Sequence, residues 1–269
     1  MKSKPFPPQA DPNCISTWFP PLQRSGVPVP KTELLHTDLP LFRLAYNDPV
    51  AGFEGFEREL RQAVERMGLP CILRTGHGSG KHQWEETCFL ANVDHLRSHI
   101  YRLVEWTQIV DIVGLPTNVW AVRELLPTEP AFHAPAFGNM PVCRERRYFL
   151  SGGQVIAHVP YWPVEAMMQG CTVCWNPRVL KPPDWREKLQ ALNQETPDEV
   201  AELTRLSKQV GRHFDGDWSL DWLHTTRGWY AIDMARAQDS WACPEELSRS
   251  DEGNEPCPNI PKHQPRPSD

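Results

Sequence analysis

The sequence lacks the features that mark several large classes of protein. Basic residues do not predominate, because 28 Lys and Arg stand against 34 Asp and Glu, and a net charge of -6 gives no electrostatic basis for binding nucleic acid. Long apolar runs are missing as well. The longest segment without a charged residue, 148–164, is shorter than the ~20 residues of a membrane-spanning helix. We therefore expect neither a nucleic-acid partner nor a membrane segment.

Cysteine is too sparse for a disulfide-rich scaffold, with eight residues at scattered positions. The first residues contain no apolar segment of the kind found in secretory signal peptides. We therefore expect reduced thiols and a cytoplasmic protein. His133, His158 and His213 do not have the spacing of metal ligands, and Cys171 and Cys174 form a single pair without a second one, so we interpret all five as structural residues.

The length and the apolar content favour one folded domain, which we expect to be divided into two lobes by a cleft. The 269 residues are near the upper limit of roughly 250–300 for a single core, and 40% of them are hydrophobic. Proline, at 28 residues, is about twice as frequent as the usual ~5%, so many segments must be loops or strand edges. The Pro-rich residues 1–30 are expected to be extended. The residues from Ser248 onward, which lack aromatic side chains, are expected to be disordered.

Periodic patterns predict alternating helices and strands, and therefore an α+β fold. Apolar residues recur at steps of three and four in three segments, which is typical of amphipathic helices. These segments are 53–67, which ends before Gly68, 92–103, which begins at the N-cap Asn92, and 196–210, which begins with the capping box of Thr196 and Glu199. Strands are predicted at 71–73 and 118–126, in a hairpin at 148–159, and in a second hairpin that joins 217–223 to 229–234.

A glycine-rich loop, Thr75–Lys81, follows the first predicted strand. It is not a phosphate-binding loop of the Walker type, because Thr75 stands where that motif has Gly and His82 stands where it has Ser or Thr. Arg74, the backbone amides of the loop and Lys81 are still suitable groups for binding a triphosphate. An ordinary hairpin turn is the alternative.

Two acidic residues lie inside the apolar strands of the second hairpin, Asp221 in WSLDWL and Asp233 in WYAIDMA. Antiparallel pairing places Asp221 opposite Ile232 or Asp233, depending on the register. Since a carboxylate in an apolar strand is unfavourable unless it is paired, the two acids together suggest a shared Mg²⁺. The alternative is that both form salt bridges with arginines, for which Arg144, Arg146, Arg147 and Arg236 are available.

The segment 144–147 places three arginines at the start of a predicted strand. Side chains alternate along a strand, so Glu145 and Arg147 point one way and Arg146 points the other. Arginine binds anions through two parallel hydrogen bonds, which makes Arg147 a candidate ligand for a phosphate or a carboxylate. A solvated strand edge is the alternative.

Five segments, in this order, resemble motifs of the ATP-grasp superfamily of carboxylate–amine ligases, in particular its short, divergent bacterial and phage members. The segments are TWFPPLQRSGVPVPKTELL, LPCILRTGHGSGK, VWAVRELLP, RERRYFLSGGQVIAHVPYWP and DWSLDWLHTTRGWYAIDMA, and the resemblance covers residues 18 to about 241. It implies an ATP-grasp fold, in which two α+β lobes clamp a nucleotide, without the full Rossmann-like domain that many relatives carry. The implied regions are an extended segment 1–48, a lid lobe 49–118, a core lobe with metal-binding strands 119–245, and a disordered tail 246–269.

The resemblance also implies a site for ATP and Mg²⁺. The implied nucleotide ligands are Arg74, Gly78, Ser79, Gly80 and Lys81 at the phosphates and Glu124, Leu125 and Leu126 at the adenine. The implied metal ligands are Asp221 and Asp233. The implied catalytic residues are Lys81, which holds the phosphates, and Arg147, which stabilises a tetrahedral oxyanion.

The activity that the resemblance implies is the ATP-dependent joining of a carboxylate to an amine, with ADP and phosphate as products and small molecules or peptides as substrates. Two residues depart from the family pattern. Arg74 takes a position that is usually Lys, and Ala235 takes the position of an Asn that serves as a further metal ligand, although Asp239 nearby could replace it. The alternative is therefore a non-catalytic nucleotide-binding or interaction protein that retains the fold.

Overall fold

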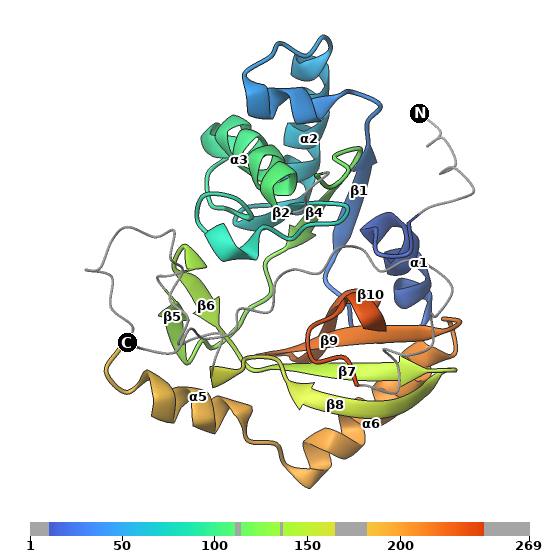
Figure 1. The fold of residues 1–269 in the computed structure, drawn as a ribbon. Helices are drawn as coiled ribbons and strands as arrows, with labels where there is room; N and C mark the ends of the chain where they lie inside the picture. Colours follow the sequence, from blue (N-terminus) through green and yellow to red (C-terminus); the bar gives the residue numbers. More distant parts are fainter. Residues whose placement is uncertain (1–10, 111–113, 135–136, 165–181, 245–269) are drawn as a thin grey trace, which may run out of the picture.

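The computed structural model describes residues 11–110, 114–134, 137–164 and 182–244 (Figure 1). The predicted disordered tail and the Cys171–Cys174 pair lie outside these residues. The helices are α1 (Ile15–Arg24), α2 (Phe53–Met67), α3 (Leu96–Ile109), α5 (Trp185–Asn193) and α6 (Pro197–Gly211). The strands are β1 (Thr32–His36), β2 (Cys71–Thr75), β3 (Phe89–Leu90), β4 (Val119–Glu124), β5 (Phe132–Ala134), β6 (Met140–Val142), β7 (Glu145–Ser151), β8 (Gln154–Pro160), β9 (Asp217–Thr225) and β10 (Gly228–Arg236). The mixture of helices and antiparallel sheets confirms the predicted α+β class.

The first sheet has the strand order β1-β4-β2-β3, and its neighbouring strands are antiparallel. Helices α2 and α3 pack against one face of it, where Leu60 and Leu103 join Leu73 and Trp120 in one apolar core. Helix α2 has the predicted bounds. Asn92 accepts a hydrogen bond from the backbone N–H of Asp94 in the short 3₁₀ turn η3 (Val93–His95), which leads into α3. The other face of this sheet is directed toward the rest of the molecule.

The second sheet has the strand order β10-β9-β7-β8 and consists of the two predicted hairpins. Helix α6 begins as predicted, because the Thr196 hydroxyl accepts a hydrogen bond from the backbone N–H of Glu199 at 3.2 Å. Helix α5, which the sequence pattern did not reveal, precedes α6 along the chain, and its buried Trp185 and Leu189 pack with the small β5-β6 sheet.

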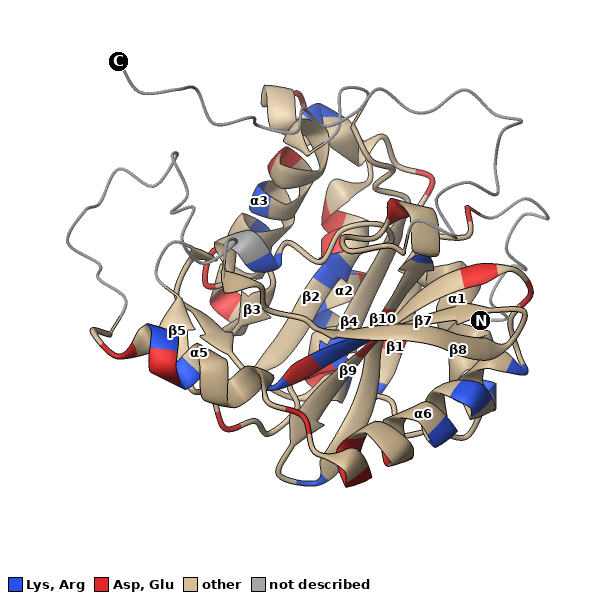
Figure 2. Cartoon of the chain, turned by 60° about the horizontal axis from the view of Figure 1, so that its bottom comes forward, with Lys and Arg blue, Asp and Glu red and all other residues tan. Residues whose placement is uncertain are grey.

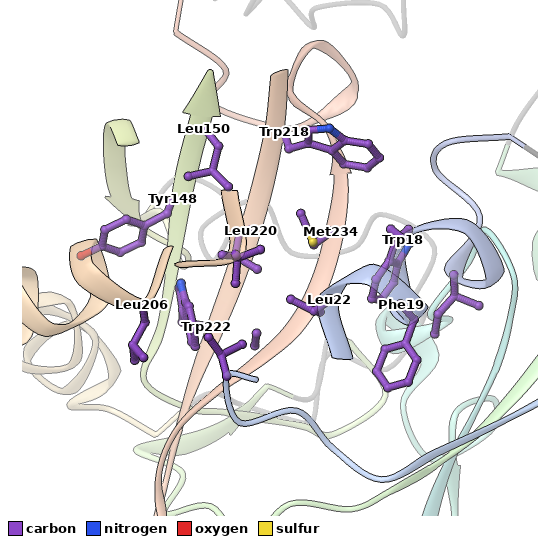
Figure 3. Close-up of a cluster of buried hydrophobic side chains, with 14 of the residues drawn as sticks. Trp18, Phe19, Leu22, Tyr148, Leu150, Leu206, Trp218, Leu220, Trp222 and Met234 are labelled. Atoms are coloured by element: carbon purple, nitrogen blue, oxygen red, sulfur yellow. The ribbon is translucent and has the colours of Figure 1, made fainter. Parts of the chain in front are cut away.

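A second apolar core lies between α6, the second sheet and α1. Figure 3 shows Tyr148, Leu220 and Met234 of the sheet, with Leu206 of α6 on one side and Leu22 of α1 on the other. Among the described residues, no helix combines the length and the apolar composition that crossing a membrane requires. Figure 2 shows charged residues mainly on the outer helices, while a basic and an acidic segment lie side by side within the second sheet. These charged residues of the second sheet form part of the candidate site.

The expectation of an extended segment at 1–30 is wrong for residues 15–24, which form α1. Ile15, Trp18 and Leu22 are fully buried at helical spacing. Their burial outweighs the two intrahelical hydrogen bonds that Pro20 and Pro21 cannot donate. Helix α1 contacts β4 of the first sheet and β10 of the second, so it joins the two.

Residues 32–36, which belong to the same predicted extended segment, form β1. They pair with β4, and β4 also pairs with β2. The chain therefore leaves the first sheet after Glu124, whereas the predicted lobe boundary lies at 118. The division into a lid lobe and a core lobe stays a prediction.

Candidate functional site

A row of charged residues crosses the second sheet. Asp233 of β10 is the cross-strand partner of Asp221 of β9, and Asp221 is the partner of Arg147 of β7. Because cross-strand partners have their side chains on the same face, these three residues lie side by side. The register depends on a bulge at Ile232, which is an extra residue in β10; if Ile232 were paired regularly after Ala231, it would lie opposite Asp221 in place of Asp233. Of the two registers that the sequence allows, the structure has the one that joins the two acids.

Arg147 binds Asp221 through two hydrogen bonds, from Nε to Oδ1 at 2.7 Å and from Nη2 to Oδ2 at 2.8 Å. Burial disfavours the charged guanidinium, but Asp221 stabilises it, so the pKa of Arg147 is raised above its ordinary value. Arg146 points to the opposite face, where its Nε lies 2.7 Å from Oε1 of Glu199. Of the arginines that could pair with Asp221, the structure therefore brings Arg147 to it.

Asp233 forms its salt bridge with a residue of the first sheet. Arg74 Nη1 of β2 lies 3.0 Å from Asp233 Oδ1, and the Arg74 side chain is only 5% exposed, against 32% for Asp233. Burial opposes ionisation of Asp233, but the nearby cations Arg74, Arg123 and Lys81 lower the pKa of its carboxyl group below the ordinary value. Asp233 is therefore ionised at neutral pH, and its salt bridge joins the two sheets.

The two sheets enclose a cleft of about 150 Å³ at this salt bridge. The cleft is lined by seven of the residues that the sequence analysis selected: Arg74, Ser79, Lys81, Glu124, Leu125, Leu126 and Asp233. Its lining does not include Gly78, Gly80, Arg147 or Asp221. The roles of all eleven residues stay predictions.

The glycines of the loop allow close packing of the backbone. A Cβ atom on Gly78 would lie 2.1 Å from Cζ3 of Trp106, and one on Gly80 would lie 2.7 Å from Cδ2 of Leu103, so both glycines let the loop approach α3. The backbone N–H of Ile15 donates to the Gly76 carbonyl at 2.8 Å, which attaches the loop to α1 as well. Packing therefore accounts for Gly78 and Gly80 independently of any bound phosphate.

Lys81 ends this loop with its ammonium group inside the molecule. Nζ donates a hydrogen bond to the hydroxyl of Tyr161 and lies 4.0 Å from the centre of the Tyr161 ring. Burial lowers the pKa of Lys81, but Tyr161, Glu145 and Asp221 raise it, and the net shift is upward. Lys81 is therefore charged at neutral pH.

Two charged cleft residues were not among the predicted ligands. Arg123 Nη2 and Glu145 Oε2 are buried without a hydrogen-bond partner among the described residues, and both side chains line the cleft. Burial and the nearby Arg74 lower the pKa of Arg123 to about 9, while burial raises the pKa of Glu145 to about 7. A charged residue inside the apolar run VWAVRELL is the signal that could have identified Arg123.

Arg123 also connects three strands. Its Nε donates to the Thr32 hydroxyl of β1 at 3.1 Å. Its Nη1 donates at 2.7 Å to the carbonyl of Ile232, which is the extra residue of β10.

We use the name cleft cations for the four basic residues at or beside the cleft, Arg74, Lys81, Arg123 and Arg147. We use the name cleft acids for Glu145, Asp221 and Asp233.

The carboxylate of Glu124, at the end of β4, is bound by Lys31 and Arg227. Oε2 accepts a hydrogen bond from the backbone N–H of Lys31 at 2.8 Å, and Oε1 pairs with Arg227 in the β9-β10 turn. Burial opposes ionisation, but Arg227 and Lys31 lower the pKa of Glu124. The Glu124 side chain thus fixes the start of the segment 124–126 to the second sheet.

The cleft acids fit Mg²⁺ in part. Asp221 and Asp233 are oxygen ligands on one face of the sheet, and Mg²⁺ bound with nucleotides usually takes one or two carboxylates, with phosphate oxygens and water as the remaining ligands. Among the described residues, no group of three or more His, Cys, Asp or Glu side chains could hold a metal ion. Ala235 offers no ligand atom, and Asp239 Oδ2 accepts a hydrogen bond from Asn13 at 2.6 Å. Asp221 and Asp233 would therefore be available as two metal ligands once Arg147 and Arg74 leave them to bind the phosphates of a nucleotide.

No family model matches the sequence, and no curated protein is significantly similar to it. The structure is similar to that of Cdc123 from Schizosaccharomyces pombe, with a TM-score of 0.50 and 12% identity over 83% of each chain. The RimK domain ATP-grasp protein from Sphaerobacter thermophilus matches with a TM-score of 0.45 and 12% identity over 83% of this chain and 57% of its own. D-alanine–D-alanine ligase from Bacillus anthracis, in complex with ATP, matches with a TM-score of 0.44 and 10% identity over 83% of this chain and 54% of its own. At these identities the similarity concerns the fold.

Proposed function

We infer that this chain, whose fold is that of the ATP-grasp superfamily, binds ATP between its two sheets and uses it to activate a carboxylate. The observation that carries the proposal is the excess of positive charge at the cleft. The four cleft cations face three cleft acids, of which Glu145 is only partly ionised at neutral pH because its pKa is about 7. An anionic ligand would balance this charge and provide a partner for the buried N–H of Arg123.

The triphosphate would lie along the cleft cations, with the base against residues 124–126. Arg74 and Lys81 would bind the phosphate oxygens, because both are charged and both line the cleft. Catalysis of phosphoryl transfer consists mainly of positioning and charge stabilisation, so no nucleophilic Ser or Cys is required. Mg²⁺ held by Asp221 and Asp233 would supply charge neutralisation at the transferred phosphoryl group.

The reaction has two steps. An oxygen of the substrate carboxylate forms a bond to the γ-phosphorus while the bond from that phosphorus to the β,γ-bridging oxygen breaks, which yields ADP and an acyl phosphate. An amine nitrogen then attacks the acyl carbon, loses a proton and expels inorganic phosphate. Arg147 would stabilise the oxyanion that develops in the second step. Its guanidinium would first have to leave Asp221, in response to the bound nucleotide. Small-molecule or peptide acids and amines are the proposed substrates.

The test is ADP formation by the full chain with ATP and Mg²⁺ over a panel of carboxylic acids and amines. We expect ADP release that depends on both a carboxylate and Mg²⁺. Nucleotide binding is measured separately, as the rise in Tm on addition of ATP. An unchanged Tm at millimolar ATP, with and without Mg²⁺, would contradict the proposal.

A second candidate is a non-catalytic nucleotide-binding protein with the same fold. It is favoured by Ala235, which replaces a metal ligand of the family pattern, and by the engagement of both Asp221 oxygens with Arg147. The two candidates differ in outcome: a rise in Tm with ATP, but no ADP from any acid and amine pair, would favour the second.

A further inference from the structure

Tyr161 lies between two of the cleft cations. It follows β8, and its aromatic ring has Lys81 Nζ at 4.0 Å and the Arg147 guanidinium carbon at 4.9 Å from the ring centre. Its hydroxyl accepts a hydrogen bond from Lys81. One side chain therefore contacts a cation from the loop of the first sheet and a cation from the second sheet.

The segment that carries Tyr161 is fixed to the second sheet. The backbone N–H of Tyr161 donates to the carbonyl of Glu145 at 3.2 Å, and the indole N–H of Trp162 donates to the carbonyl of Cys143 at 2.9 Å. The two rings pack edge to face, with their centres 4.9 Å apart. Since both residues are attached at the start of β7, Tyr161 has a defined position relative to Arg147, and Lys81 reaches it from across the cleft.

Aromatic rings attract cations through their electron-rich faces, and this attraction is strongest where water is excluded. Lys81 loses its hydration on burial, and the hydroxyl and ring of Tyr161 replace part of it. Without Tyr161, the ammonium group would be buried with a weaker set of partners and would move toward solvent, taking the end of the loop with it.

We propose that Tyr161 is a positioning residue that holds Lys81 and Arg147 in place before a nucleotide binds. The proposal rests on the proposed function in one respect, namely that Lys81 is a ligand of the phosphates and Arg147 stabilises the oxyanion. A cation held in place in the free protein loses less conformational entropy on binding, so Tyr161 should increase affinity for the phosphates without contacting the base.

The direct test is trypsin cleavage after Lys81 in the ligand-free full chain, measured by mass spectrometry of the fragments. Tyr161→Leu removes both the hydroxyl and the ring, and we expect cleavage after Lys81 to become at least tenfold faster. Tyr161→Phe keeps the ring, and we expect a smaller increase of about threefold. Tyr46→Leu is the matched control, because Tyr46 is 69% exposed, and it should leave cleavage at this bond unchanged.

Unchanged cleavage after Lys81 in a folded Tyr161→Leu variant would overturn the proposal. If that variant does not fold, Tyr161→Phe decides, and a rate equal to that of the wild type overturns the proposal. The second readout is binding: Tyr161→Phe should weaken ATP about tenfold and leave adenosine unchanged, since only ATP has phosphates. If the wild type binds no ATP, the proposed function fails, whereas the cleavage result still decides whether Tyr161 positions Lys81.

Discussion

Replacing Asp233 with Asn removes the charge that joins the two sheets while keeping the size of the side chain. Arg74 is 5% exposed and would be left without its carboxylate partner, and Arg123 would lose a nearby negative charge. Removing one partner of a buried ion pair costs about 3–5 kcal/mol. Because Asp233 is itself 32% exposed, solvent reduces this cost, and we expect a loss of about 2 kcal/mol in the free energy of unfolding.

The pKa of Asp233 is lowered in the folded protein, so the stability that it contributes is present above the ordinary pKa of an aspartate and is lost as the pH falls through the folded value. Measurements at pH 7 therefore report the whole effect. Urea unfolding at this pH should show a lower midpoint with an unchanged slope, and Tm should fall by about 4–8 °C. Asp38→Asn is the matched control, because the Asp38 side chain is 88% exposed, and its effect should be below about 0.5 kcal/mol.

The same variant separates the metal from the nucleotide. Arg74 and Arg123 are free to bind phosphates in Asp233→Asn, so ATP in the presence of EDTA should raise Tm at least as much as it does in the wild type. The added effect of Mg²⁺ on that rise should decrease, and ADP formation should be lost. Wild-type ADP release by Asp233→Asn would refute the role of Asp233, and an unchanged stability of the ligand-free variant would refute the charge pairing.

Three further predictions test the structure. Gly78→Ala should lower the free energy of unfolding by about 1–3 kcal/mol because the new methyl group meets Trp106, whereas Gly55→Ala, at an open position in α2, should raise it by about 0.5–1 kcal/mol; urea unfolding of both decides, and equal effects would contradict the packing of the loop. Glu145→Gln should stabilise the protein increasingly from pH 5 to pH 8, because the folded pKa of about 7 means that ionising Glu145 opposes folding over this range; a pH-independent difference in unfolding free energy would exclude this. Thr196→Ala should cost about 1 kcal/mol through loss of the N-cap, and Thr196→Ser should restore most of it in the same assay.

The sequence predicted those elements whose pattern is local. Helix α2 has the predicted bounds, and the turn of the β9-β10 hairpin joins the predicted strands, because periodicity and turn residues act over a few positions. Helix α1 was missed because Pro20 and Pro21 argue against a helix, while the burial that stabilises it comes from β4 and β10, which are distant in sequence.

The candidate site was predictable only in part, for the same reason. The proximity of Asp221 and Asp233 followed from their hairpin, and the bulge that selects the register did not. The partner of Asp233 could not be inferred, since Arg74 is 159 residues away and belongs to the other sheet. Tyr161 could not be identified from the sequence, because its contact with Lys81 depends on how the two sheets face each other.

The extra residue Ile232 supplies an acceptor for Arg123 without disturbing the alignment of the two acids. Deleting this single residue would restore regular pairing, with Ala231 opposite Trp222 and Asp233 still opposite Asp221, but it would remove the carbonyl to which Arg123 donates. A related chain could thus lose one anchor of Arg123 by a three-nucleotide deletion while every acidic and basic residue is retained. In comparisons among relatives, the number of residues between Asp221 and Asp233 therefore reports on the position of Arg123, which the identity of the acids does not.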